Sequence, residues 1–161
     1  MYPAAHMAAY YTSQAYDAPS EVIWRVLTDF AKWPAWFPSV SYVELSPGDP
    51  PRTGAEILAF ADGRDTWTRW RIGEWRAPHR LLCEHVESNG SFSGQVQAAY
   101  LLFDLIDDPE GCTLEVEIGA DGYGLVGDFF VGVTLGAEVR RTLPRLVDAF
   151  SAYVIERAAA G

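Results

Sequence analysis

The sequence contains 161 residues, of which 49% are hydrophobic and 14% aromatic, which is enough for one globular domain with a sizeable core. Twelve basic residues against 22 acidic ones give a net charge of −10, and no basic cluster interrupts the acidity. This charge repels phosphate backbones and anionic lipids, so we expect no nucleic-acid partner. The chain has no apolar run long enough to span a membrane and no signal-peptide pattern over residues 1–10, so we expect a cytoplasmic protein.

A single domain is expected over residues 8–158, with residues 1–7 as an N-terminal extension. Residues 8–16 predict a first strand, which ends at Asp17-Ala18-Pro19. Pro19 suits the first position of a helix, and one apolar face follows it at helical spacing, made of Ile23, Val26, Leu27 and Phe30. Residues 32–38 contain two tryptophans, a phenylalanine and two prolines, and predict a second short helix or turn.

Six further strands are expected, each bounded by turn residues such as proline, glycine and aspartate. In the last of them Leu114, Val116 and Ile118 alternate with polar residues, which is typical of a strand with one buried face and one solvated face. The strands are predicted at residues 40–45, 55–61, 65–75, 81–87, 92–106 and 112–120.

Residues 125–157 predict a long amphipathic helix of roughly 45 Å. Pro144 removes one backbone hydrogen bond, so we expect a kink or a fresh start there. The stripe also contains Arg140, whose guanidinium needs a partner or a wet cavity if it faces inward. The predicted stripe consists of Val126, Phe129, Phe130, Val133, Ala137, Arg140, Val147, Phe150 and Val154.

The order of strand, two short helices, six strands and one long helix predicts an α+β fold. In it, a curved antiparallel sheet of about seven strands grips the C-terminal helix. Such an arrangement leaves space between sheet and helix, and the aromatic segment 33–38 is placed at its mouth.

Cys83 and Cys112 have no CxxC spacing and are expected to be buried free thiols. If one strand separates theirs, they stand about 10 Å apart, too far for a disulfide.

Several short motifs occur in order along the chain: residues 18–24 (Ala-Pro-Ser-Glu-Val-Ile-Trp), 27–29 (Leu-Thr-Asp), Trp33-Pro34 with Phe37-Pro38, and Gly54-Ala55-Glu56. Together they resemble the START/Bet v 1-like (SRPBCC) superfamily, and within it the polyketide cyclase/dehydrase branch. The similarity runs from Tyr11 to Ile155 and implies the helix-grip fold. It also implies a cavity for a small hydrophobic molecule, because the superfamily includes aromatase/cyclases as well as lipid and hormone carriers.

In aromatase/cyclases of this family, tryptophans and an arginine line the pocket. Trp33 and Phe37 match the aromatic pair after the first helix. If Trp70 and Ile72 face inward, however, Thr66 and Thr68 stand where tryptophans are usual, and Ile72 stands where those enzymes carry an arginine. The opposite strand parity would turn Trp67, Arg69 and Arg71 inward instead, which suits a strand with two arginines less well.

For catalysis, His85 is the candidate base, because it shares strand parity with Leu81 and Cys83 and its pKa can lie near 7. Arg140 would polarise a carbonyl or anchor a carboxylate, and Tyr100 would donate a proton or a hydrogen bond. The alternatives are a histidine bonded to backbone, an Arg140 ion pair with Glu56 or Asp104, and a core tyrosine.

Ten further residues are candidate ligand contacts, although most of the aromatic ones are also the residues that would pack a core. They are Trp33, Trp36, Phe37, Tyr42, Glu56, Trp70, Tyr123, Phe129, Phe130 and Val133.

The Gly-x-Gly-x-x-Gly motif at residues 122–127 lacks the later strand that a dinucleotide fold needs, so a hinge before the long helix is preferred and no cofactor is expected. The three histidines are scattered, so no metal site is expected either.

Three functions stay open: a cofactor-independent cyclase, aromatase or dehydratase acting on a polyketide-like molecule, a noncatalytic carrier or sensor of a lipid or secondary metabolite, and a partner-binding module that uses the outer face of the sheet. The protein would act as a monomer or homodimer.

Overall fold

The computed structural model of the protein describes residues 8–38, 40–46, 52–61, 63–89, 96–122 and 136–160, and its elements run in the predicted order. The strands are β1 (Ala8–Tyr16), β2 (Tyr42–Leu45), β3 (Glu56–Ala61), β4 (Thr66–Arg76), β5 (Arg80–Ser88), β6 (Val96–Asp108) and β7 (Gly111–Gly122). The helices are α1 (Ser20–Leu27), the 3-10 helix η1 (Phe30–Ala35) and α3 (Gly136–Ala160).

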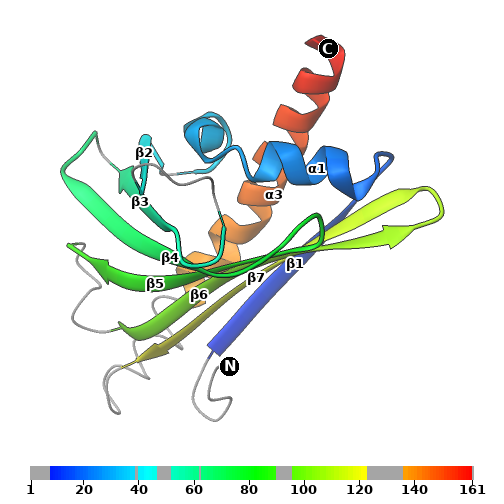
Figure 1. Ribbon diagram of the computed structural model, residues 1–161. Coiled ribbons are helices and arrows are strands. Elements are labelled where there is room, and N and C mark those ends of the chain that lie inside the picture. Colours follow the sequence, from blue (N-terminus) through cyan, green and yellow to red (C-terminus); the bar gives the residue numbers. More distant parts are fainter. Residues whose placement is uncertain are drawn as a thin grey trace.

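The seven strands form one antiparallel sheet in the order β1-β7-β6-β5-β4-β3-β2. Strands β2 to β7 are joined to their neighbours in sequence, and β1 pairs with β7 along its whole length. Figure 1 shows the sheet curving around α3, with α1 and η1 on the same side of the sheet as α3. The α+β helix-grip architecture predicted from the sequence is therefore confirmed.

Alternation of side chains gives the sheet an inner face toward α3 and an outer face. On β6, Leu101, Phe103 and Leu105 are buried, and the residues between them are more exposed. On β7 the inner positions are held by Leu114 and Val116, both without solvent contact, as the alternation predicted. These residues belong to one core cluster with the short helices and α3.

The short helices cover one end of the inner face. Ile23 and Leu27 of α1 are fully buried, and Trp24 packs edge-on against Trp75 of β4, with ring centroids 4.9 Å apart. The helix begins at Ser20, whose buried hydroxyl donates a hydrogen bond to Asp107 at the end of β6. This contact fixes the start of α1 to the sheet.

Helix α3 continues through Pro144, which lies on its exposed side. The predicted stripe is correct for Val147 and Phe150 but wrong for Arg140, which is exposed. The prediction kept a strict seven-residue spacing, whereas a helix of 3.6 residues per turn drifts away from that spacing. The buried face is formed by Val139, Leu143, Leu146, Val147 and Phe150.

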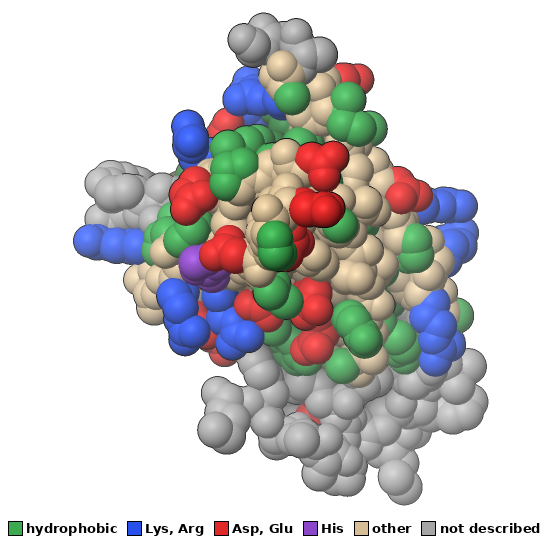
Figure 2. Space-filling model, turned by 90° about the vertical axis from the view of Figure 1, so that its right-hand side faces the viewer, with side chains coloured by type: hydrophobic (Ala, Val, Ile, Leu, Met, Phe, Trp, Pro, Cys, Tyr) green, Lys and Arg blue, Asp and Glu red, His purple; other side chains and the backbone are tan. Residues whose placement is uncertain are grey.

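The outer face of the sheet carries cross-strand ion pairs. Arg80 holds Asp104 through two hydrogen bonds of 2.7 and 3.0 Å, and this contact raises the pKa of the guanidinium. Figure 2 shows acidic side chains gathered on the face of the molecule that includes the turn between β6 and β7, where Asp107, Asp108 and Glu110 are exposed.

No helix among the described residues is long and apolar enough to cross a membrane.

Cys83 and Cys112 are free and buried, and β6 lies between their strands. The estimate of 10 Å considered only the sideways distance. Cys83 is opposite Leu101, which is opposite Ile118, and Ile118 lies six residues from Cys112 along β7. That offset adds about 20 Å along the strand, so the two thiols lie in different parts of the core.

Candidate functional site

His85 lies on the inner face of β5, in line with the buried Leu81 and Cys83. It pairs with Trp70 on the neighbouring strand β4, and the two rings meet edge-on with centroids 5.8 Å apart. Arg69 pairs with Glu87 and Trp70 pairs with His85, so the register of β4 against β5 shifts by one residue between these pairs. This shift brings the side chains of Trp70 and His85 opposite each other. Sequence reasoning identified both residues, but their contact depends on this irregularity.

The imidazole of His85 is half-buried, and no described side chain or backbone group hydrogen-bonds to it. Burial lowers its pKa below the usual 6.5, and the nearby Glu87 carboxylate offsets part of that effect. His85 is therefore neutral at pH 7, the form in which an imidazole nitrogen can accept a proton.

The strands next to His85 carry short side chains on the inner face. The pairing of β5 with β6 runs to Glu84 and Tyr100. Continuing this register by one residue brings His85 next to Ala99, which pairs with Ala120 on β7. Farther along the same strands these inner positions hold Phe103 and Val116. The side chains that fill the inner face therefore become smaller toward His85.

The aromatic residues of η1 and the turn after it are mainly part of the core. Trp33 is 2% exposed and contacts Phe103, and its indole N–H donates a 2.8 Å hydrogen bond to the Leu27 carbonyl oxygen. Trp36 is 3% exposed and contacts α3. Phe37, half-buried, stacks on Trp33. Of these three predicted ligand contacts, only Phe37 reaches the surface.

Tyr100 lies on the outer face of the sheet, on the opposite side from His85. Its ring lies across Gly119, where an added Cβ would meet the ring atoms, and its hydroxyl donates to Glu117. Burial and the Glu117 carboxylate raise the pKa of the phenol. The alternation around Leu101 turns Tyr100 outward, so Tyr100 and His85 cannot act on one reacting centre, and this placement does not support a joint catalytic role for them.

Arg140 pairs with neither of the expected carboxylates, since Glu56 contacts Arg71 at 3.4 Å and Asp104 is held by Arg80. Its guanidinium lies 5.0 Å from the ring centroid of Tyr10 on β1. This contact borders a groove of about 180 Å³ between β1 and α3. Because β1 and β5 are three strand spacings apart, about 14 Å along the sheet, Arg140 beside Tyr10 lies far from His85.

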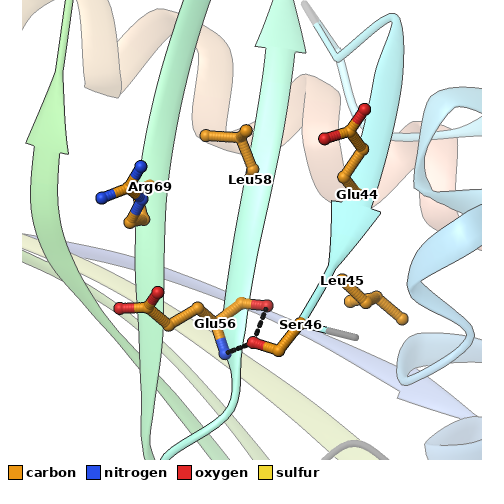
Figure 3. Close-up of a pocket in the computed structure, with 6 residues that line it drawn as sticks. All are labelled: Glu44, Leu45, Ser46, Glu56, Leu58 and Arg69. Atoms are coloured by element: carbon orange, nitrogen blue, oxygen red, sulfur yellow. Dashed lines mark hydrogen bonds between the residues drawn. The ribbon is translucent and has the colours of Figure 1, made fainter. Parts of the chain in front are cut away.

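Glu56 and Tyr42 both lie on the outer face. Tyr42 is 41% exposed and has the Arg64 guanidinium 4.1 Å above its ring. An open groove of about 330 Å³ lies over β2, β3 and β4. Figure 3 shows the residues that line it, among which the Ser46 hydroxyl bonds the backbone of Glu56. It is lined by Glu44, Leu45, Ser46, Glu56, Leu58 and Arg69. This placement separates Glu56 and Tyr42 from His85.

The strand parity preferred for residues 66–72 is confirmed. Ile72 is buried and Trp70 packs against the core, whereas Arg69 and Arg71 pair with Glu87 and Glu56 on the outer face.

Four predicted contacts lie outside the described residues, as does most of the glycine motif at 122–127. They are Tyr123, Phe129, Phe130 and Val133. Among the described residues, no three His, Cys, Asp or Glu side chains are grouped so that they could hold a metal ion.

Sequence reasoning placed Ile118 on a buried face, but it missed Tyr10 and the alanines Ala99 and Ala120 near His85. Tyr10 pairs with Ile118, and both pack against the core from the inner face. The alternation along β1 and β7 was the available signal, but their place beside α3 follows from the pairing of the first strand with the last.

A family model described as polyketide cyclase / dehydrase and lipid transport matches residues 7–154, and the chain belongs to this family. The family has the Bet v 1-like fold of the SRPBCC superfamily, as the resemblance implied.

Solved structures with the same fold include aromatase/cyclases, other enzymes and proteins of other kinds. The chain is similar to the Zhui aromatase/cyclase from Streptomyces sp. R1128, with 18% identity, a TM-score of 0.73, and 97% of this chain and 99% of that chain covered. For Ara h 8.0201 the identity is 13% and the TM-score 0.74, with 93% of this chain and 99% of that chain covered. For a point mutant of norcoclaurine synthase from Thalictrum flavum, in complex with a transition-state analogue, the identity is 14% and the TM-score 0.70, with 94% of this chain and 96% of that chain covered. At these identities the likeness shows the fold alone, and a comparison with curated proteins finds no match.

Proposed function

We propose that the protein binds a small hydrophobic, polyketide-like molecule between the sheet and α3. We further propose that it catalyses a cofactor-independent cyclisation, aromatisation or dehydration there, with His85 as the base. The observation that carries the proposal is a half-buried imidazole on the inner face, edge-on to Trp70 and unbonded among the described residues, whose pKa is lowered by burial. Membership of a family that includes cyclases supports it.

The chemistry requires removal of a proton from a CH2 group between two carbonyls. An imidazole nitrogen of His85 takes that proton, and the electron pair left on carbon is delocalised into the carbonyl oxygens. Trp70 positions the imidazole through the edge-on ring contact. Arg140, beside Tyr10, would anchor a distant carboxylate or carbonyl of an extended substrate.

Ethyl benzoylacetate in D2O provides a direct assay, because NMR follows exchange of its central CH2 protons. We expect the protein to accelerate the exchange and His85→Gln to reduce the acceleration about a hundredfold or more, as expected for loss of a general base. The matched control is His79→Gln, because His79 lies outside the inner face, 2.8 Å from Asp107. Equal rates in both variants would remove His85 from the mechanism.

The noncatalytic alternative has support in the family description, which includes lipid transport. Native mass spectrometry of the purified protein for a retained small molecule tests binding separately. Retention of a molecule together with no accelerated exchange in the wild type would favour a carrier or sensor.

A further inference from the structure

The two tryptophans of the η1 region differ in the state of their indole N–H groups. The Trp33 N–H is satisfied by the Leu27 carbonyl oxygen at 2.8 Å. The Trp36 N–H is fully buried and has no hydrogen-bond partner among the described residues. The two indoles are three residues apart on one short segment. The Trp33 N–H bonds a backbone carbonyl, whereas the Trp36 N–H has no acceptor among the described residues.

The surroundings of Trp36 are aromatic. Its ring meets Phe150 of α3 edge-on, with centroids 4.7 Å apart, and lies 5.4 Å from Phe37 and 5.7 Å from Trp33. A ring face offers an N–H only a weak interaction. The contact with Phe150 places Trp36 where η1 and α3 meet over the inner face of the sheet.

A buried donor without an acceptor has lost the hydrogen bonds that it made with water in the unfolded chain. Phenylalanine would keep the contact with Phe150 and avoid that loss. A tryptophan at this position is physically reasonable if a bound ligand supplies the hydrogen-bond acceptor for its N–H.

We propose that the Trp36 N–H donates a hydrogen bond to a carbonyl oxygen of the bound ligand, so that the site selects apolar molecules that carry such an acceptor. This inference rests on the proposed binding of a small hydrophobic molecule and adds the chemical group that the molecule must present. Of the four rings gathered here, only Phe37 reaches the surface. The proposal therefore expects the ligand oxygen to approach the donor past the Phe37 ring.

The test uses 2-acetylnaphthalene and 2-ethylnaphthalene, which have nearly the same shape but differ in the carbonyl oxygen. Dissociation constants of both probes are measured by calorimetry for the wild type, Trp36→Phe and Trp33→Phe. We expect the ratio of the ethyl to the acetyl constant to fall about fivefold to tenfold in Trp36→Phe, the effect of one hydrogen bond. Trp33→Phe should leave this ratio within about twofold, because its N–H is already used.

Nitrogen-15 NMR of the indole N–H groups gives an independent readout, with the Trp36 signal assigned by its disappearance in Trp36→Phe. The acetyl probe should move that proton resonance downfield, and the ethyl probe should not. An unchanged ratio in Trp36→Phe, or an unmoved Trp36 signal while the acetyl probe is bound, overturns the inference and leaves the proposed function standing. Failure of the wild type to bind either probe counts against the proposed binding of a small hydrophobic molecule and overturns both.

Discussion

At the end of the inner face where β6 turns into β7, Leu105 and Leu114 are fully buried beneath the short helices, whereas at the other end Trp70 and His85 are only half-buried. The first pair lies on β6 and β7 and the second on β4 and β5 of the same sheet, and alternation along each strand turns all four residues inward. The first end contributes buried apolar area and hence stability. The second end keeps a titratable ring and short side chains, and the proposed chemistry is placed there for that reason.

The largest expected effect comes from truncation at the filled end. Phe103→Ala removes a ring that is 1% exposed and contacts Trp33, so we expect a loss of about 3–5 kcal/mol in the free energy of unfolding, measured by urea denaturation. Ile118→Ala, at the half-buried end, should cost clearly less. Equal losses for the two variants would remove the distinction between the ends.

The second comparison exchanges an indole for a phenyl ring at two places. Trp33→Phe leaves the buried Leu27 carbonyl without its donor, whereas Trp36→Phe removes a donor that has no acceptor among the described residues. We expect Trp33→Phe to be less stable than Trp36→Phe by about 1–3 kcal/mol in urea denaturation. The reverse order would mean that the Trp36 N–H is satisfied in the free protein.

A smaller effect is expected on the outer face. Tyr100→Phe removes the hydroxyl that bonds Glu117 and should cost about 1 kcal/mol of stability. Because Tyr100 and His85 lie on opposite faces, the catalysed exchange of ethyl benzoylacetate should stay within about twofold of the wild type. A large loss of exchange in a stable Tyr100→Phe variant would contradict this placement of the site.

The smallest effect concerns pH. Burial holds the pKa of His85 below 6.5 in the folded state, so between that lowered pKa and 6.5 the unfolded chain binds more protons. The free energy of unfolding should therefore fall as pH decreases through this window. Urea midpoints of the wild type and His85→Gln, measured above and below the window, should show a weaker decrease in the variant, with His79→Gln as control.

The architecture was predictable because its signals are local. Alternation in residues 112–120 and the helical spacing after Pro19 each describe one element, and the burial of Val116 and Ile23 follows directly. The outward orientation of Tyr100 could also have been predicted from the sequence, because the apolar Leu101 and Phe103 occupy the alternate positions of the same strand.

The rest depends on contacts between elements distant in sequence. The exposure of Arg140 reflects the phase of α3, which a seven-residue spacing misjudges over several turns. The contact of His85 with Trp70 requires an irregular pairing of β4 with β5. That the Trp36 N–H has no acceptor among the described residues depends on how η1 packs against Phe150 of α3. None of these signals exists within a single segment.

The two cysteines offer a built-in reporter of opening. Burial raises the pKa of Cys83 to about 12, and Cys112 likewise has no solvent contact, so both sulfur atoms are withheld from aqueous reagents in the folded state. Modification by a thiol-specific dye then proceeds at the rate at which the sheet separates from its helices. Since the two sites lie in distant parts of the core, comparing their labelling kinetics distinguishes local breathing from global unfolding, without any engineered probe.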